Sequence, residues 1–416
     1  MTTARPGLAI RRVTREELPA FFETVSIAFL EPMDAPAVAE AVAPYWDLDR
    51  VWVAWDGPVA AATFRSWASE VTLPGGATVP AAAVAGVTTR PTHRRRGLLR
   101  ALAAAEHAAA RERGEAVAML HASEFPIYGR FGYGAAVVQA TWTLDTTAPT
   151  FLAGDPRAVE IVSREAARSI LPDVFERHRA LQAGEIRRRD YRWDDELGLI
   201  TFPWEKPWNG YVIVHRGGED RPDGYARYTV EARWEQGRPS GTIAVQELIA
   251  NGDSAYADLW RFLAEVDLVG TVRAERRRVH ERLPWLLADQ RAAAVVDVGD
   301  GVHLLLLDVA RVLAARAYER TDRVVIEVVP PPGSPELGGG RFLLDASPDG
   351  ATCRATTASP DLTVPLAALG AVVLGEGRLR WAAEAYGGVD EHAGGALERA
   401  DRLFRTLDEP WCTTFF

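Results

Sequence analysis

The segment that most restricts how this chain can fold is RRRGLLR, Arg94–Arg100, in which four arginines surround Gly97. The small apolar run AAAVAGVTT precedes it, and the alanine-rich segment ALAAAEHAAARERG, which favours a helix, follows it. Gly114 is placed to end that helix, because glycine readily adopts the left-handed conformation common just after a helix. The sequence therefore predicts a strand, a glycine turn and a helix in succession, an order typical of α/β domains.

Such a turn can bind phosphate, because unpaired N–H groups and the helix dipole place positive charge at the start of the helix. Leu98 and Leu99 fill positions that the P-loop and the dinucleotide-binding motif keep small, so the match to either motif is weak. The spacing from Arg94 to Gly97 instead suits a pyrophosphate, with Arg95 and Arg100 as further sources of charge. A solvated basic helix start is the alternative reading of the segment by itself.

The length of 416 residues predicts two or three domains. Thr14 and Glu17 form a capping-box pattern at the start of an N-terminal helix. After a turn-rich linker at 147–157, a similar order of hairpin strands, strand, turn and helix recurs, but NGDSAY at 251–256 replaces the arginine loop. We therefore expect the second domain to be a degenerate copy of the first, with domains at residues 1–147, 148–296 and 297–416.

Composition excludes several classes of protein. A formal net charge of −10 argues against nucleic acid as the main partner. The N-terminus offers no signal peptide or membrane span, so we expect a cytoplasmic protein, and export without a signal peptide stays open. Only Cys353 and Cys412 are cysteines, and the eight histidines show no metal-ligand spacing, so we expect no disulfide framework and no metal. The basic run ERRRVHERLPW, 275–285, is interpreted as a solvated helix.

Two segments together resemble a known family. The run VTTRPTHRRRGLLRALAA is similar to the coenzyme A pyrophosphate loop of GNAT superfamily N-acetyltransferases, and HASEFPIYGRFGYG, 121–134, resembles the enhanced intracellular survival (Eis) type of actinobacteria. The resemblance implies an α/β (α+β) chain with two GNAT-like domains, the second degenerate, and a sterol-carrier-protein-like third domain. It also implies a homohexamer.

The resemblance further implies acetyl-CoA as co-substrate. The strand before the loop is expected to splay from the next strand, so that its free N–H groups stabilise the oxyanion that develops on the thioester. Ser123 is expected near the thiol end of the cofactor. The residues expected at the cofactor are Val87, Thr89, Arg94, Arg95, Gly97, Leu98, Leu99 and Ser123.

Acyl transfer to an amine also needs an acid for the departing thiolate and a base for the ammonium. The resemblance assigns the acid to Tyr128, with Tyr133 as the competitor, and the base to the terminal carboxylate of Phe416. The apolar residues of the tail PWCTTFF predict a docked chain end rather than a frayed one.

The acceptor is expected to be a primary amine, on a small molecule or a peptide, in the class of aminoglycosides, lysine-containing peptides or polyamines. By resemblance, Phe29 and Glu31 belong to the amine pocket, with Glu31 standing where the family usually has an aspartate. Two alternatives stay open: a catalytically silent sensor of acyl-CoA, and a lipid-binding protein that uses the third domain.

Overall fold

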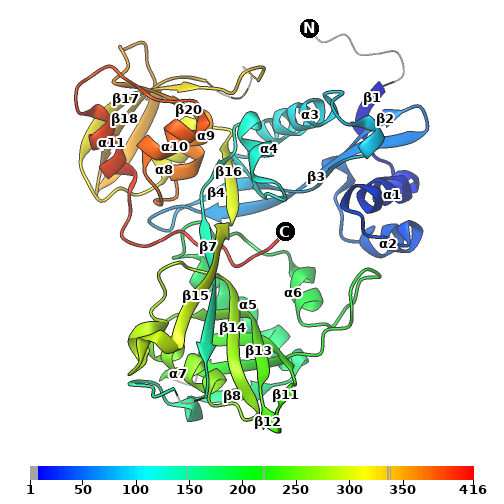
Figure 1. Cartoon of the computed structure of the whole chain (residues 1–416). Helices are drawn as coiled ribbons and strands as arrows, with labels where there is room; N and C mark the ends of the chain where they lie inside the picture. The colour runs from blue at the N-terminus through cyan, green and yellow to red at the C-terminus, as the bar shows by residue number, and fades with distance from the viewer. Residues whose placement is uncertain (1–7, 148, 219–220, 335–336, 338) are drawn as a thin grey trace.

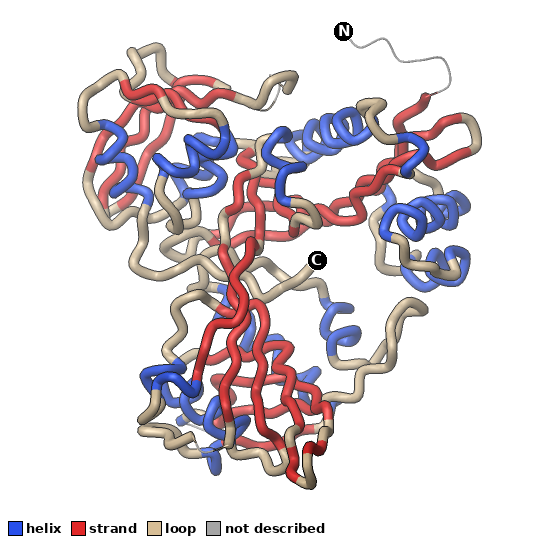
Figure 2. The backbone as a smooth tube through the Cα atoms, in the orientation of Figure 1, coloured by secondary structure: helices blue, strands red, loops and turns tan. Residues whose placement is uncertain are grey.

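The computed structural model describes residues 8–147, 149–218, 221–334, 337 and 339–416 (Figure 1). Its strands form three main sheets, which Figure 2 shows in three separate parts of the molecule. No helix in these described stretches combines the length and the apolar character needed to cross a membrane.

The first sheet has seven strands in the order β1-β2-β3-β4-β5-β16-β6. Their bounds are β1 (Leu8–Arg12), β2 (Val51–Asp56), β3 (Val59–Thr72), β4 (Thr78–Thr89), β5 (Val117–His121), β16 (Val302–Leu306) and β6 (Gly134–Ala135). The helices of this part are α1 (Leu18–Phe29), α2 (Ala35–Val42), α3 (Leu98–Glu112) and α4 (Phe125–Tyr128). The predicted capping box is present, with Glu17 accepting the backbone N–H of Thr14 at 3.0 Å.

Helices α1 and α3 cover opposite faces of this sheet. Successive side chains of a strand point to opposite faces. On β3, Arg65 stacks on Trp46 on the α1 side, whereas its neighbour Ser66 hydrogen-bonds Glu106 of α3. Alternate side chains of β3 therefore face α1 on one side of the sheet and α3 on the other.

The second sheet also has seven strands, in the order β15-β7-β14-β13-β10-β9-β8. Their bounds are β15 (Ala293–Asp300), β7 (Val138–Asp145), β14 (Val269–Arg277), β13 (Gly241–Ala250), β10 (Pro222–Glu231), β9 (Tyr211–Arg216) and β8 (Val159–Val162). The other elements of this part are α5 (Arg164–Arg179), α6 (Asp190–Glu196), α7 (Asp253–Ala264) and the small hairpin β11 (Trp234–Glu235) and β12 (Arg238–Pro239).

The third part contains a five-stranded sheet in the order β19-β18-β17-β20-β21. Its strands are β17 (Asp322–Val329), β18 (Gly340–Ser347), β19 (Gly350–Ala355), β20 (Leu362–Pro365) and β21 (Asp390–Glu391). Its helices are α8 (Val309–Ala315), α9 (Leu366–Val372), α10 (Leu379–Tyr386) and α11 (Ala396–Phe404).

Strand pairing does not follow the expected domain limits at residues 147 and 297. Strand β7, expected in the first domain, pairs with β14 and β15 of the second sheet. Strand β16, expected in the third domain, pairs with β5 and β6 of the first sheet. Alternating apolar and polar residues identify a strand, but they do not show which sheet the strand joins. The sequence therefore could not show that β7 and β16 pair outside their expected domains.

The first and third parts share one hydrophobic core, because α9 packs closely on β6 and β16. A side chain at Gly134 of β6 would place its Cβ 1.9 Å from the carbonyl oxygen of Ala367 in α9. Similarly, a Cβ at Gly370 would lie 2.3 Å from the carbonyl oxygen of Leu304. Glycine is therefore required at both positions for helix and sheet to approach each other this closely.

Candidate functional site

A gap opens between two neighbouring strands of the first sheet. Strands β4 and β5 pair in parallel only where Ala81–Ala83 face Val117–Met119, although β4 continues to Thr89. A bulge lies at this stretch of β4, where the register with β3 shifts between Thr63 and Arg65. Beyond Ala83 the backbone of β4 therefore has no recorded pairing with β5, in agreement with the splay that the family resemblance implies.

The arginine loop lies beside this gap. Its backbone is left-handed at Arg95 (φ 63°) and at Gly97 (φ 77°), and α3 begins at Leu98. Asp56 pairs with two side chains of the loop, His93 at 3.3 Å and Arg96 at 3.0 Å. These contacts fix one side of the loop on the β2–β3 turn.

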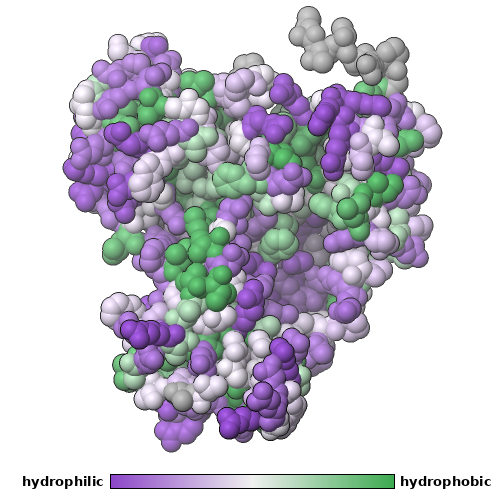
Figure 3. Space-filling model, in the orientation of Figure 1, coloured by the Kyte–Doolittle hydropathy of each residue, from purple (hydrophilic) through white to green (hydrophobic). Residues whose placement is uncertain are grey.

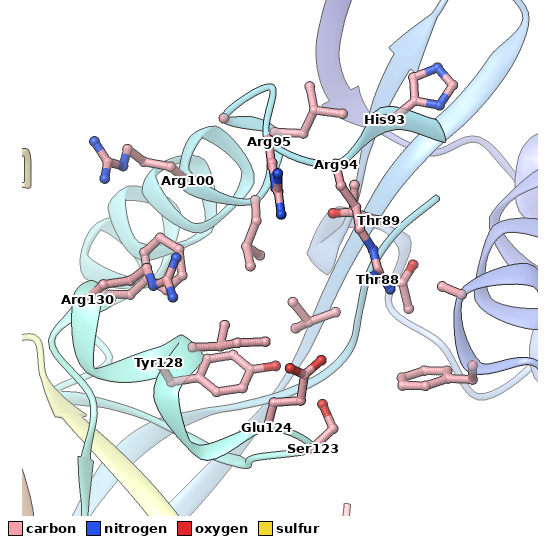
Figure 4. Close-up of a pocket in the computed structure, with 18 of the residues that line it drawn as sticks. Thr88, Thr89, His93, Arg94, Arg95, Arg100, Ser123, Glu124, Tyr128 and Arg130 are labelled. Atoms are coloured by element: carbon pink, nitrogen blue, oxygen red, sulfur yellow. The ribbon is translucent and has the colours of Figure 1, made fainter. Parts of the chain in front are cut away.

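Arg94 and Arg95 have no carboxylate partner among the residues that the structure describes. Figure 4 shows both side chains extending from the loop toward the space beneath it, and Arg100 from α3 also lines the cavity there. Two unneutralised guanidinium groups thus stand beside the free N–H groups at the start of α3. This set of donors matches the chemistry of a pyrophosphate.

The gap and the loop border a cavity of about 840 Å³. All eight residues expected at the cofactor line it, and so does Phe29 from the end of α1. Several further lining residues were not singled out from the sequence, although they lie within the two segments that carry the resemblance: Thr88, Glu124, Ile127, Arg130 and Phe131. Glu31, by contrast, is exposed and does not line this cavity.

The two tyrosines of the 121–134 segment have different surroundings. Tyr128 lines the cavity, and Figure 4 shows its phenol directed inward above Ser123 and Glu124. Tyr133 is buried away from the cavity, with its hydroxyl 2.9 Å from Nε2 of His107. Only Tyr128 is therefore placed to reach a molecule in the cavity.

Burial raises the pKa of Tyr128 above its ordinary value, the Glu124 carboxylate raises it further, and a hydrogen bond from Ser123 lowers it in part. The net direction is upward, so the phenol stays protonated at neutral pH. A protonated phenol in this position is able to donate a proton to a group in the cavity.

The C-terminal tail, residues 411–416, is docked between the first and second sheets, where Figure 1 places the chain end. The Trp411 side chain is buried and donates from Nε1 to the carbonyl oxygen of Arg276 at 2.7 Å. The Thr413 backbone N–H donates to Glu185 at 2.7 Å. Arg188 donates from Nε to Oγ1 of Thr414 at 2.9 Å. The apolar tail is thus held by specific hydrogen bonds.

The last residue reaches the end of β5. The Phe416 ring lies 4.7 Å from the ring of His121 and 5.2 Å from that of Trp67, centre to centre. Ser123, two residues beyond His121, lines the cavity that holds Tyr128. Phe416 itself is not among the residues that line that cavity.

Sequence reasoning did not identify His121 as part of this arrangement. Burial lowers its pKa to about 4, so its imidazole is neutral at physiological pH. The neutral ring donates from Nε2 to the carbonyl oxygen of Thr414 at 3.2 Å, which makes His121 a positioning residue for the tail. Its signal in the sequence was only its place at the end of a buried strand.

No group of three or more histidine, cysteine, aspartate or glutamate side chains within the described ranges is arranged to hold a metal ion.

Family comparisons match three segments of the chain. Residues 9–136 and residues 184–312 each match an acetyltransferase (GNAT) domain, and residues 309–413 match a sterol carrier protein domain. These matches agree with the two related sheets and the different third sheet.

Relatives match over most of the length. An uncharacterized N-acetyltransferase of Streptomyces griseus is 37% identical over 99% of this chain and 100% of its own. The N-acetyltransferase Eis of Mycobacterium tuberculosis is 33% identical over 74% of each chain. Among solved structures, Eis1 of Mycobacterium abscessus superposes with a TM-score of 0.84 at 33% identity, covering 98% of this chain and 100% of its own.

Proposed function

The chain belongs to the Eis-type N-acetyltransferases of the GNAT superfamily, and from that premise we propose that it transfers the acetyl group of acetyl-CoA directly to a primary amine. One observation carries the proposal. The loop with two unneutralised arginines, the free edge of β4 and the protonated Tyr128 border a single cavity. Together they supply donors for a pyrophosphate, for a thioester oxygen and for a leaving group.

In the proposed reaction the amine nitrogen attacks the thioester carbonyl carbon, so that a C–N bond forms and the C–S bond breaks. Backbone N–H groups of β4 near Val87 donate to the carbonyl oxygen as negative charge develops on it. Tyr128 gives its proton to the departing thiolate sulfur, and Ser123, beside it, orients the phenol.

The proton of the attacking amine goes to the terminal carboxylate of Phe416, directly or through one water molecule. The docked tail supports this role, because Trp411 and Thr413 fix the chain end beside β5. An unperturbed terminal carboxylate is a weak base, with a pKa of about 3.5, so the transfer requires close placement. Phe29 is proposed to border the amine pocket; Glu31, which the resemblance places there, would act from outside the cavity.

We also propose a homo-oligomer, with the hexamer of the family as the expected form. The edge strand β15 exposes Val295, Val296 and Val298, with 39%, 51% and 53% of their surface accessible. Figure 3 shows a hydrophobic patch over this strand. An exposed apolar edge strand is a ready pairing surface between copies.

The test is thiol release from acetyl-CoA, followed with a chromogenic thiol reagent, against aminoglycosides, polyamines and lysine-containing peptides. Release that depends on an amine supports the proposed transfer. Acetyl-CoA binding without release for any amine contradicts it and favours a silent acyl-CoA sensor. A co-purifying lipid, found by solvent extraction and mass spectrometry together with absent acetyl-CoA binding, favours a lipid-binding protein.

A further inference from the structure

A second cavity, of about 340 Å³, lies beside the chain end and is lined by Phe415 and Phe416. The two cavities have neighbouring residues: the His121 ring contacts Phe416, which lines the second cavity, and Ser123, two residues after His121, lines the cofactor cavity. In Figure 3 the surface is hollowed between the first and second domains, and hydrophilic atoms line the hollow.

This second cavity concentrates positive charge in a chain whose formal net charge is −10. Its charged lining groups are five arginines, one glutamate and the terminal carboxylate of Phe416; the other charged lining residues are Arg65, Arg187, Arg188, Arg189, Arg192 and Glu205. We call it the arginine cavity.

Two of these arginines are neutralised by neighbouring carboxylates. Arg188 pairs with Glu247 and, at 3.1 Å, with Glu196. Arg192 pairs with Asp195 at 2.9 Å. The positive charges of Arg188 and Arg192 are therefore compensated by carboxylates of the protein itself.

The other three, Arg65, Arg187 and Arg189, have no carboxylate partner in the described part of the chain. Arg65 lies between two indole rings, 4.0 Å from the centre of Trp46 and 4.9 Å from that of Trp67, and its buried Nε has no hydrogen-bond acceptor. Burial and the neighbouring arginines lower the pKa of Arg65 to about 9. Burying an unpaired cation destabilises the folded protein unless an anionic ligand neutralises the charge.

The uncompensated arginines of the cavity suit one kind of ligand, an anion. Guanidinium groups bind carboxylate and phosphate through paired N–H donors, and their mutual repulsion is relieved when an anion enters. The same cavity is lined by Trp67, Tyr191 and Trp204, whose flat faces suit an apolar or aromatic body. Polycations such as spermidine meet repulsion at this surface.

Resting on the proposed acetyl transfer, we propose that the arginine cavity binds an anionic group of the acceptor. The acceptor is then a primary amine that also carries a carboxylate or a phosphate, with the amine directed past His121 toward Tyr128. The arginines determine specificity and do not enter the chemistry, so the bonds formed and broken are those of the proposed function.

The experiment compares amines that share one skeleton: phenethylamine, 4-(2-aminoethyl)benzoate and the phosphate ester of tyramine, with spermidine as the polycation. We expect kcat/KM for thiol release to be roughly ten-fold or more higher for an anionic amine than for phenethylamine. The better of the two anionic amines identifies the anion as carboxylate or phosphate.

Variants then assign the preference to the cavity. Arg187→Gln, at an exposed position, and Arg65→Met, which keeps an unbranched side chain between the indoles, are expected to lose most of the preference while phenethylamine is used as before. Arg320→Gln, an exposed arginine in the third domain, is the matched control and is expected to keep it.

Three results would overturn the inference: equal use of all amines, a preference for spermidine, or an equal loss for every amine in the arginine variants. The last would mean that these arginines act on the chain end rather than on the acceptor. Transfer to no amine would instead refute the proposed function. In that case anion binding by the arginine cavity is tested separately, by calorimetric titration of 4-(2-aminoethyl)benzoate into the wild-type chain and into Arg65→Met. No binding to the wild type, or equal affinity for both proteins, would exclude the arginine cavity as an anion site.

Discussion

The imidazole of His121 donates a hydrogen bond from Nε2 to the carbonyl oxygen of Thr414 across 3.2 Å. This bond joins the end of a strand in the first domain to the third residue from the C-terminus. It holds the chain end near the cavity that Tyr128 lines, although the tail residues are not among those that line that cavity.

Adding two glycines after Phe416 is expected to lower kcat by roughly 10²-fold, because the added residues move the terminal carboxylate away from its docked position. Steady-state thiol release measures the effect, and the same two glycines added before Met1 are the control. Undiminished turnover in the C-terminal extension would exclude the terminal carboxylate as the base.

Replacing Tyr128 by Phe is expected to lower kcat by 10²-fold or more and to leave acetyl-CoA binding intact, because the variant loses only the proton donor. Tyr133→Phe is the matched variant. It is expected to keep kcat and to lose about 1 kcal/mol of stability, since the hydrogen bond to His107 disappears. Thermal unfolding and thiol release on both proteins test the pair, and the reverse pattern would transfer the acid role to Tyr133.

Within the arginine loop, Arg95→Ala is expected to raise KM for acetyl-CoA roughly ten-fold, because one guanidinium is removed from the pyrophosphate site. Arg96→Ala provides a control in the same loop, since Arg96 pairs with Asp56 and is not among the residues that line the cavity. The effect of Arg95 is expected to shrink at high salt. An unchanged KM in Arg95→Ala would show that backbone amides alone hold the phosphates.

His107 gives a prediction for pH. Burial lowers its pKa to about 3, whereas in the unfolded chain it titrates near 6.5. The folded state therefore binds fewer protons between these values, and its stability falls as pH drops below 6.5. At pH 5 the loss for this one group is about 2 kcal/mol relative to neutral pH. Urea unfolding of the wild type and of His107→Gln measures it, and equal pH dependence of the two proteins would contradict the assignment.

Local sequence patterns predicted several elements well. The helix that begins at Leu98 ends as expected before Gly114, whose φ of 79° is the left-handed value that glycine permits. The capping box at Thr14 and the docked tail were also predicted correctly. In each case the signal lies in a few adjacent residues whose chemistry has one main structural solution.

The prediction of a solvated helix at 275–285 is wrong. Residues up to Arg277 belong to β14, and the Arg277 side chain is buried in an ion pair with Glu281 at 2.9 Å. Trp411 covers it, with the guanidinium carbon 4.6 Å from the indole centre. The burial depends on a residue more than a hundred positions away, so a local charge pattern cannot show it. The exchanged strands β7 and β16 escaped prediction for the same reason.

The tail that ends at Phe416 also has a meaning for biosynthesis. The tail is synthesised after the first and second domains, and it bonds to groups in both, His121 and Glu185 among them. It can therefore dock only onto domains that have already been synthesised, and the site that it is proposed to complete forms late. A chain trimmed by a carboxypeptidase would lose the proposed base while the cavity around Tyr128 keeps its lining.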